Sequence, residues 1–153
     1  MREIKFKAWD KKGKQIINHE HLIMTCDGFF AIDEEGTEFP MDVIMQYTGR
    51  KDKNSKEIYR GHIVSFGLLC NPLGSSYELQ TGEVIFEYGS FVIKYYFDWS
   101  EKIEFRNLSD FFYSKESHYV PNVGDVFDRS DKPINDLEII GNKFENPELR
   151  IDK

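Results

Sequence analysis

Two histidines and a cysteine near the N-terminus are the residues whose types come closest to a metal or catalytic site. His19 and His21 flank Glu20, and Cys26 follows soon after them. In an extended segment, residues two positions apart face the same side, so both imidazoles could reach one metal ion. No second cluster of ligands accompanies them, whereas a zinc site takes about four ligands, or about three and a water molecule. A metal-dependent hydrolase using His19 and His21 is therefore an alternative hypothesis, and a solvated polar stretch is the simpler interpretation.

Other patterns that mark catalysis are missing. Cys26 has no nearby signature of a nucleophile with its base, and both Cys26 and Cys70 are expected to pack as small hydrophobic side chains. The acidic run from Asp125 to Asp136 lacks the alternating oxygen ligands and the closing Glu of a calcium loop. The chain contains no glycine-rich phosphate loop, no Gly-x-Ser-x-Gly and no His-Glu-x-x-His. The sequence thus predicts no catalytic residue, no bound metal and no cofactor.

A basic cluster beside two tyrosines is the strongest candidate for a binding surface. Aromatic side chains interleaved with bases can stack on nucleotides and neutralise phosphates. Asp52 and Glu57 lie within this cluster, however, and most of the remaining chain is acidic, which disfavours nucleic acid. The sequence predicts a surface for nucleic acid or for a partner protein, formed by Tyr47, Arg50, Lys51, Lys53, Lys56, Tyr59 and Arg60.

The distribution of charge limits the partners further. The chain has 153 residues and a formal net charge of −7. Residues 1–60 contain eleven Lys or Arg and eleven Asp or Glu, whereas residues 61–153 contain nine and sixteen, so the second part carries the whole excess. A negative field of this kind repels the phosphate backbone unless a local basic patch overcomes it. The sequence also allows, without demanding it, that the acidic part mimics nucleic acid and blocks a host enzyme.

Nothing in the sequence indicates insertion into a membrane or secretion. The longest apolar runs, such as Phe91-Val92-Ile93, fall far short of the roughly 18–20 residues that span a bilayer. The first residues, from Met1 to Lys5, lack the apolar core of a secretory signal. We therefore expect a cytoplasmic protein.

Alternation of apolar and polar residues predicts a mainly β chain. Apolar residues at positions 4, 6 and 8 alternate with lysines before a polar turn, which predicts a β-hairpin over residues 1–17. Residues 82–97 contain two alternating runs around Tyr88-Gly89-Ser90, the clearest hairpin in the chain. Further short strands are expected at residues 22–24, 29–32, 43–47, 58–59, 61–66 and 137–140.

One short helix is expected among these strands. Asn107 can cap it, and Leu108, Phe111 and Phe112 fall on one helical face. A helix this short depends on tertiary packing for its stability. Near the C-terminus, Asn146-Pro147 predicts a single capped turn with proline at its first position.

Four stretches of the chain match a known family in their order and spacing. They are Arg2–Asp10, Met45–Tyr59, Gly82–Phe91 and Ile139–Leu149. Through them the chain resembles the YopX family of phage and prophage proteins. Two positions depart from the family pattern: Asn54-Ser55 stands where the family tends to have Asn-Gly, and His62 stands where it tends to have an acidic residue. The first departure weakens a turn, because Ser tolerates a positive φ less well than Gly.

The resemblance implies an N-terminal β region over residues 1–58 and a C-terminal SH3-like barrel with a tail over residues 59–153. The order of the expected strands, with a tight hairpin at 82–97 and a late closing strand at 137–140, agrees with such a barrel. The resemblance also implies a phage or prophage origin, and hence the cytoplasm of a bacterial host cell. The family has no agreed catalytic residues, so the resemblance implies no activity.

We therefore expect a non-enzymatic phage accessory protein that binds a host or phage protein. Self-association is a further expectation, because small barrels of this type have open strand edges that pair readily.

Overall fold

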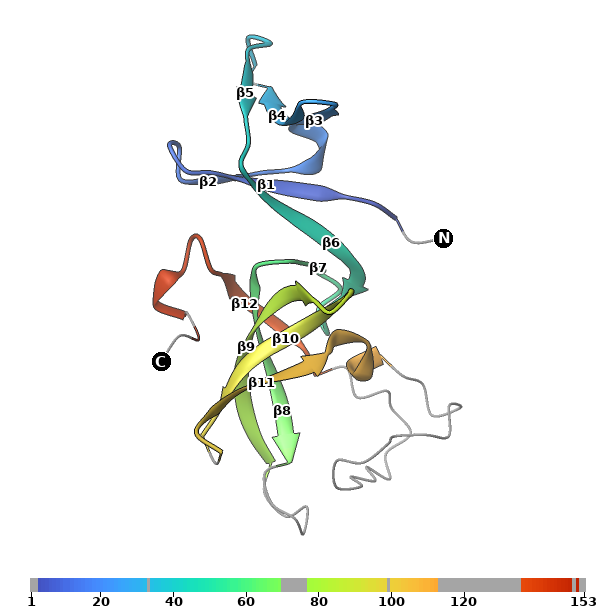
Figure 1. Ribbon diagram of the computed structural model, residues 1–153, viewed down its shortest axis with the longest axis vertical. Coiled ribbons are helices and arrows are strands. Elements are labelled where there is room, and N and C mark those ends of the chain that lie inside the picture. Colours follow the sequence, from blue (N-terminus) through green and yellow to red (C-terminus); the bar gives the residue numbers. More distant parts are fainter. Residues whose placement is uncertain are drawn as a thin grey trace.

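Three antiparallel β-sheets make up the chain (Figure 1). The computed structural model describes residues 3–32, 34–69, 77–98, 100–112, 136–149 and 151. These residues form twelve strands and three short 3-10 helices. The prediction of a mainly β fold is confirmed. No helix in this part of the chain has the length and apolar character needed to cross a bilayer.

The first sheet has the strand order β2-β1-β6-β7. Its strands are β1 (Phe6–Asp10), β2 (Gln15–Ile17), β6 (Val43–Lys51) and β7 (Glu57–Tyr59). β1 and β2 form the predicted N-terminal hairpin, because the polar turn between them brings Trp9 opposite Ile16. β1 also pairs with β6, which buries Ala8 completely between its neighbours.

The second sheet is small and lies at the opposite end of the molecule from the strands formed by residues 62–107 (Figure 1). It contains β3 (Leu22–Thr25), β4 (Gly28–Ile32) and β5 (Glu38–Pro40), and a 3-10 helix, η1 (His19–His21), leads into it. The two apolar runs predicted as strands around residues 22–32 therefore pair with each other, with Ile23 opposite Phe30.

The third sheet has the order β11-β10-β9-β8-β12 and curls into half a barrel (Figure 1). Its strands are β8 (His62–Leu69), β9 (Tyr77–Glu87), β10 (Ser90–Phe97), β11 (Lys102–Asn107) and β12 (Glu138–Asn142). The hairpin predicted at residues 82–97 is confirmed, with Val84 opposite Ile93. Tyr88 and Gly89 have φ angles of 51° and 78°, and two adjacent positive φ angles match the twist of a two-residue hairpin turn.

The main hydrophobic core fills the concave side of this sheet. Phe66, Val84 and Ile93 have no exposed surface there, and the 3-10 helix η2 (Leu108–Phe112) adds the side chains of Leu108 and Phe111. The predicted cap is present, because the Asn107 side chain accepts a hydrogen bond from the backbone of the second η2 residue at 3.0 Å. The predicted helix is a 3-10 turn, as is common for segments of this length.

Strand β7 contributes to two separate cores. Ile58 joins the main core, whereas Tyr59 packs with Met45 and Tyr47 in a smaller cluster. The two side chains point to opposite faces because successive residues of a strand alternate. The first and third sheets thus share apolar contacts at residues 58–59. The division of the chain into 1–58 and 59–153, and the SH3-like class of the barrel, stay predictions.

A buried carboxylate ties the β6–β7 turn to the last strand. Asp52 is only 3% exposed. Its Oδ1 accepts hydrogen bonds from the backbone N–H groups of Asn54 and Lys56, both at 2.9 Å, and its Oδ2 accepts one from Ile139 of β12 at 3.0 Å. Hydrogen bonds to an ionised acceptor are about twice as strong as neutral ones. One side chain therefore orders a turn and attaches it to a strand that lies 87 residues away.

Further contacts reinforce this attachment. The backbone N–H of Lys53 donates to the Leu137 carbonyl at 2.8 Å, and its ammonium forms an ion pair with Glu138. Ser55, at the tip of the turn, has a φ of 64°, in the region that glycine prefers. We call residues 52–56 with residues 137–139 the Asp52 clasp.

Two replacements of Asp52 are expected to destabilise the protein to different extents. Asp52→Ala leaves three backbone N–H groups without their acceptor, and we expect the free energy of unfolding to fall by about 3–5 kcal/mol. Asp52→Asn keeps one acceptor oxygen but turns an amide N–H towards Ile139, so the expected loss is about 1–2 kcal/mol.

Urea unfolding at neutral pH measures both losses. Asp42→Ala is the matched control, because the Asp42 side chain is 82% exposed and its removal should change the stability by no more than about 0.5 kcal/mol. Equal, small losses for the two Asp52 variants would contradict the role assigned to this carboxylate.

Candidate functional site

The two histidines of the predicted pair do not face the same side of an extended strand. His19 and His21 lie in η1, not in an extended segment, and side chains two positions apart on a 3-10 helix point in different directions. The Nδ1 of His19 accepts a hydrogen bond from the Phe6 backbone N–H at 3.3 Å. Within the described ranges, no three His, Cys, Asp or Glu side chains gather where they could hold a metal ion.

The other candidates for chemistry are also placed differently. Cys26 is exposed in the turn between β3 and β4, so the expectation that it packs as a buried thiol is wrong. Cys70 and the acidic run up to residue 135 lie outside the described residues.

A cluster of ionisable side chains that the sequence did not predict joins Lys5, just before β1, to Glu57 and Tyr59 of β7. Lys5 forms an ion pair with Glu57 at 2.7 Å, and the Tyr59 hydroxyl donates a hydrogen bond to the other Glu57 oxygen at 2.8 Å. The hydrogen bond from Lys5 holds the pKa of Glu57 below its usual value, despite partial burial. Burial and the hydrogen bond to Glu57 raise the pKa of Tyr59 far above its usual value. Both groups therefore keep their ordinary charge at neutral pH.

His62 completes this cluster. Its Nδ1 accepts a hydrogen bond from the Tyr59 backbone N–H at 3.3 Å, and the two rings meet edge to face with centroids 5.7 Å apart. Burial lowers the pKa of His62 to about 4; the positive charge of Lys7 acts in the same direction and the negative charge of Asp52 opposes it. The imidazole is therefore neutral at pH 7, and its acceptor nitrogen is already used by the backbone. The hydrogen bonds of this cluster connect β7 to the segment before β1 and to His62 of β8.

The structure separates the residues of the predicted basic surface. Tyr47 and Tyr59 are 5% and 1% exposed and pack against each other with centroids 5.4 Å apart, so neither can stack on a nucleotide. Lys53 belongs to the Asp52 clasp. Arg60 lines a small pocket of about 250 Å³ beside β12, whereas Arg50 lines a larger cleft.

The two remaining bases lie on the β6–β7 hairpin. Lys51 stands opposite Glu57 in the strand register, and Lys56 is exposed in the turn. The sequence thus located several exposed bases, but the fold does not gather them around the two tyrosines.

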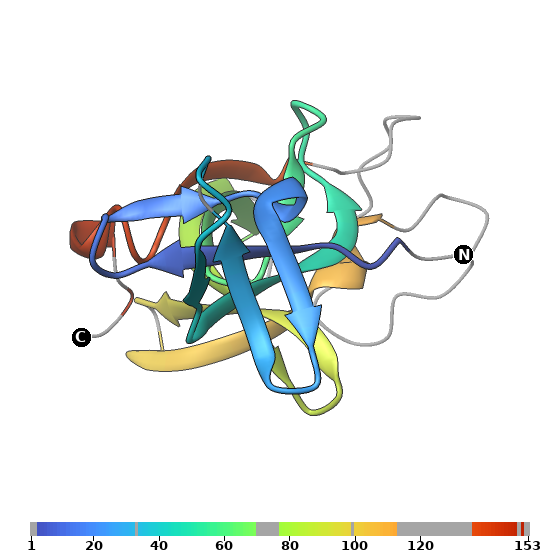
Figure 2. The same cartoon turned by 90° about the horizontal axis from the view of Figure 1, so that it is seen from above.

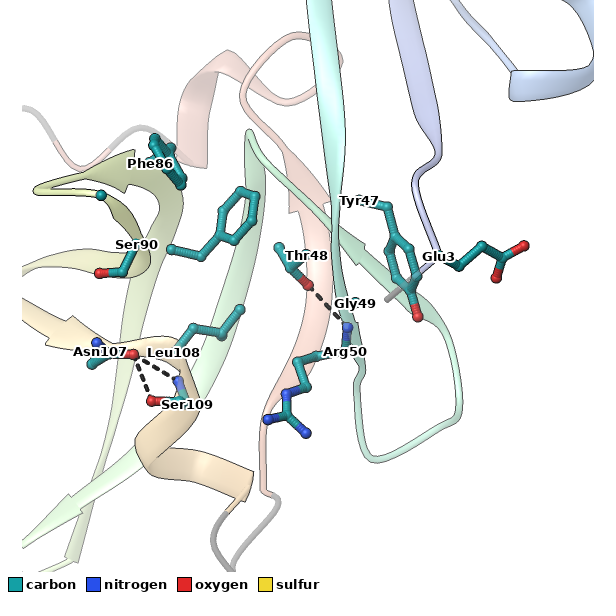
Figure 3. Close-up of a pocket in the computed structure, with 12 residues that line it drawn as sticks. Glu3, Tyr47, Thr48, Gly49, Arg50, Phe86, Ser90, Asn107, Leu108 and Ser109 are labelled. Atoms are coloured by element: carbon teal, nitrogen blue, oxygen red, sulfur yellow. Dashed lines mark hydrogen bonds between the residues drawn. The ribbon is translucent and has the colours of Figure 1, made fainter. Parts of the chain in front are cut away.

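A cleft of about 640 Å³ opens between the end of β6 and the third sheet (Figure 3). One wall comes from β6, and the other comes from the β9–β10 turn, the end of β11 and the start of η2. The lining residues are Glu3, Tyr47, Thr48, Gly49, Arg50, Phe86, Gly89, Ser90, Phe91, Asn107, Leu108 and Ser109. Figure 3 shows Thr48 and Arg50 facing Leu108 and Ser109, whereas Glu3 points away from the opening.

The β6 wall is held by a hydroxyl and a glycine. The Thr48 hydroxyl donates to the Ile58 carbonyl at 2.9 Å and accepts a hydrogen bond from the Arg50 backbone N–H at 3.2 Å. Gly49 has a φ of 80° and lies at an irregularity in the pairing of β6 with β7. This bulge directs Arg50 towards η2, where its guanidinium lies 5.0 Å from the centre of the Phe112 ring.

The opposite wall presents polar side chains beside an aromatic ring. The Asn107 side-chain oxygen accepts hydrogen bonds from the backbone and the hydroxyl of Ser109, at 3.0 and 2.7 Å. Phe86 is 47% exposed and meets the ring of Phe91 edge to face at 5.1 Å. Among the described residues, no carboxylate forms an ion pair with Arg50.

These groups are suited to binding. A guanidinium, hydroxyl groups and an exposed ring can hold a ligand. Among the described residues of the lining, no His, Cys or Lys side chain could act as a base or nucleophile. Glu3, the one carboxylate among the described lining residues, is paired with Lys5 at 3.1 Å. Sequence reasoning found Tyr47 and Arg50 of this lining. It missed Phe86 and Ser109, because only the fold brings β9 and η2 next to β6.

The neutral state of His62 predicts a dependence of stability on pH. Because the pKa falls from 6.5 to about 4 on folding, the unfolded chain binds more protons than the folded chain between these pH values. The contribution of neutral His62 to the free energy of unfolding is complete above pH 6.5 and is lost as the pH falls towards 4. The loss has an upper limit of about 3 kcal/mol.

Urea unfolding at a series of pH values tests this dependence. His62→Asn can keep the acceptor for Tyr59 but cannot titrate, so its stability should fall less steeply on acidification than that of the natural protein. His21→Asn, at an exposed histidine, is the matched control. The same slope for the natural protein and His62→Asn would contradict the assignment.

Comparisons with known proteins agree with this architecture. The profile of the family described as "YopX protein" matches residues 5–150, nearly the whole chain. Among solved structures, the crystal structure of protein EF1440 from Enterococcus faecalis shares the fold, with 22% sequence identity and a TM-score of 0.53. The similarity covers 97% of this chain and 99% of that chain. No curated protein matches the sequence. The chain belongs to the YopX family.

Proposed function

We propose that the protein is a phage or prophage accessory protein that binds a segment of a host or phage protein in the cleft between β6 and η2, without catalysing a reaction. The observation that carries the proposal is the lining of this cleft. There, hydroxyl groups and a guanidinium that has no ion-pair partner among the described residues surround a half-exposed ring. Membership of the YopX family supports the phage-related role and, with it, action in the cytoplasm of a bacterial host.

The cleft has the chemistry to select a particular kind of segment. The planar guanidinium of Arg50 can hold a carboxylate through two parallel hydrogen bonds. The exposed face of Phe86 offers contact to an apolar or aromatic side chain a few residues away from that carboxylate. Ser90 and Ser109 supply hydroxyl groups for the backbone of the bound segment. We therefore propose a partner segment that carries an acidic residue close to an apolar one.

The ionisable groups outside the cleft favour binding over catalysis. Glu57, Tyr59 and His62 are engaged with each other and with the backbone. Asp52 is used entirely by the clasp. A nucleic-acid partner is less favoured by this geometry, because Tyr47 and Tyr59 are buried.

Photocrosslinking inside bacterial cells tests the proposal. A benzoyl-phenylalanine replacing Phe86 is expected to form a covalent adduct with a partner protein, identified by mass spectrometry. Phe39 is the matched control, because it is an equally exposed phenylalanine (46% against 47%) on β5, outside the cleft. Arg50→Glu in the Phe86-labelled protein should reduce the adduct about tenfold, the effect of losing about 1.4 kcal/mol of binding.

Three results would contradict the proposal. They are equal adducts from positions 86 and 39, an adduct that Arg50→Glu leaves unchanged, and crosslinking to nucleic acid in place of protein.

A further inference from the structure

The two outer strands of the third sheet are in different situations. The β12 end is covered by the Asp52 clasp, whose turn bonds to Leu137 and Ile139. At the other end, no described strand pairs with the outer edge of β11. Figure 2 shows β11, in orange, along the margin of the molecule. An edge strand of this kind presents free backbone donors and acceptors to another strand.

Two apolar side chains of β11 are exposed to solvent. Phe105 stands opposite Lys94 in the register, so it faces away from the core, and it is 48% exposed. Ile103, on the same face, is 36% exposed. Glu104 and Arg106 lie on the concave face, opposite Tyr95 and Ile93. An open edge with two exposed apolar side chains is a surface that a partner strand would cover.

We propose that two copies of this chain associate by antiparallel pairing of β11 with β11 across a two-fold axis at Phe105. In this register Phe105 faces its own counterpart, and Glu104 faces Arg106 of the second copy twice. Ile103 then stands opposite Asn107. The interface is a strand edge distinct from the binding proposed for the cleft, although Asn107 places the second copy beside the rim of the cleft.

The charges select this register over its neighbours. Residues that stand opposite each other in an antiparallel pair share a face, so one residue must lie opposite its own copy. Centring the pair on Glu104 would place Glu104 against itself and Lys102 against Arg106, and like charges directly opposite are destabilising. Centring it on Ile103 would pair fewer residues of β11. Only the register centred on Phe105 combines a long overlap with opposite charges.

Local contacts hold both charges in position for this pairing. Glu104 accepts hydrogen bonds from the hydroxyl groups of Tyr95 and Ser100, each at 3.1 Å. The Arg106 guanidinium lies 4.6 Å from the centre of the Phe111 ring. The charge of Arg106 also acts on the carboxyl of Asp110, whose pKa it lowers against the larger effect of burial. In the described part of the chain neither Glu104 nor Arg106 forms an ion pair at 4 Å or less, so both charges can pair with the second copy.

The interface is small, and the expected dimer is weak. One short strand buries less than the roughly 1,200 Å² of a typical stable complex, so we expect a dissociation constant between about 1 μM and 1 mM. Analytical ultracentrifugation of the full chain over concentrations up to about 1 mM covers this range.

Single charge reversals provide the sharpest test. Glu104→Arg makes every charge of β11 positive at the interface, and Arg106→Glu makes the central pair wholly negative, so each variant alone should remain monomeric. An equimolar mixture of the two should associate, because the two arginines of the first variant would then face the two glutamates of the second. Both variants should keep the natural circular dichroism spectrum.

A second pair of variants tests the centre of the interface and leaves Glu104 and Arg106 unchanged. Phe105→Lys places two ammonium groups opposite each other and should abolish the dimer. Ile140→Lys is the matched control, because Ile140 is 42% exposed on β12, at the other end of the sheet, and its replacement should leave association unchanged. A natural protein that stays monomeric at about 1 mM would overturn the proposal. So would a dimer that survives Phe105→Lys, or a charge-reversed mixture, natively folded, that fails to associate.

Discussion

The carboxylate of Asp52 is the constraint on which the arrangement of the sheets depends. It is buried, and it accepts three backbone hydrogen bonds that come from two distant parts of the chain. A buried acceptor of this kind is costly unless all of its hydrogen bonds are made, so the turn and β12 must be in place together. Because the turn continues β6 directly, the clasp also fixes the wall that carries Thr48 and Arg50. The cleft is thus a consequence of how the first sheet is attached to the third.

Several ionisable side chains of the molecule stabilise the fold. Asp52, Glu57 and His62 lie close to one another in the fold, yet each is engaged with the backbone or with a neighbouring side chain. Among the described residues, the groups left available are of a different kind: the guanidinium of Arg50, the ring of Phe86 and the outer edge of β11. A guanidinium, an aromatic face and an unpaired strand are the means by which proteins recognise other proteins. This division between structural and available groups is the physical basis of the binding role that we propose.

Sequence patterns predicted local structure well and the long-range arrangement poorly. The alternation around Tyr88-Gly89 and the cap at Asn107 depend on neighbouring residues, and both are present in the fold. Asp52 stands between lysines in a polar turn, so the sequence suggested an exposed charge. In the fold it is buried, and one of its two oxygens accepts a hydrogen bond from a strand 87 residues away. The tyrosines beside the basic cluster are buried for a related reason, since strand pairing directs them inward. The prediction that His19 and His21 face the same side was wrong, because they lie in the 3-10 helix η1 and not in an extended segment.

Amide hydrogen exchange followed by NMR tests the Asp52 clasp most directly. If one buried carboxylate holds both segments, the amides of Asn54 and Lys56 in the turn must open in the same event as the amide of Ile139 in β12. The account predicts similar, strong protection for all three amides, lost together in Asp52→Asn. Rapid exchange at Asn54 and Lys56 beside slow exchange at Ile139 would show that the turn moves independently of the sheet, and would contradict the account.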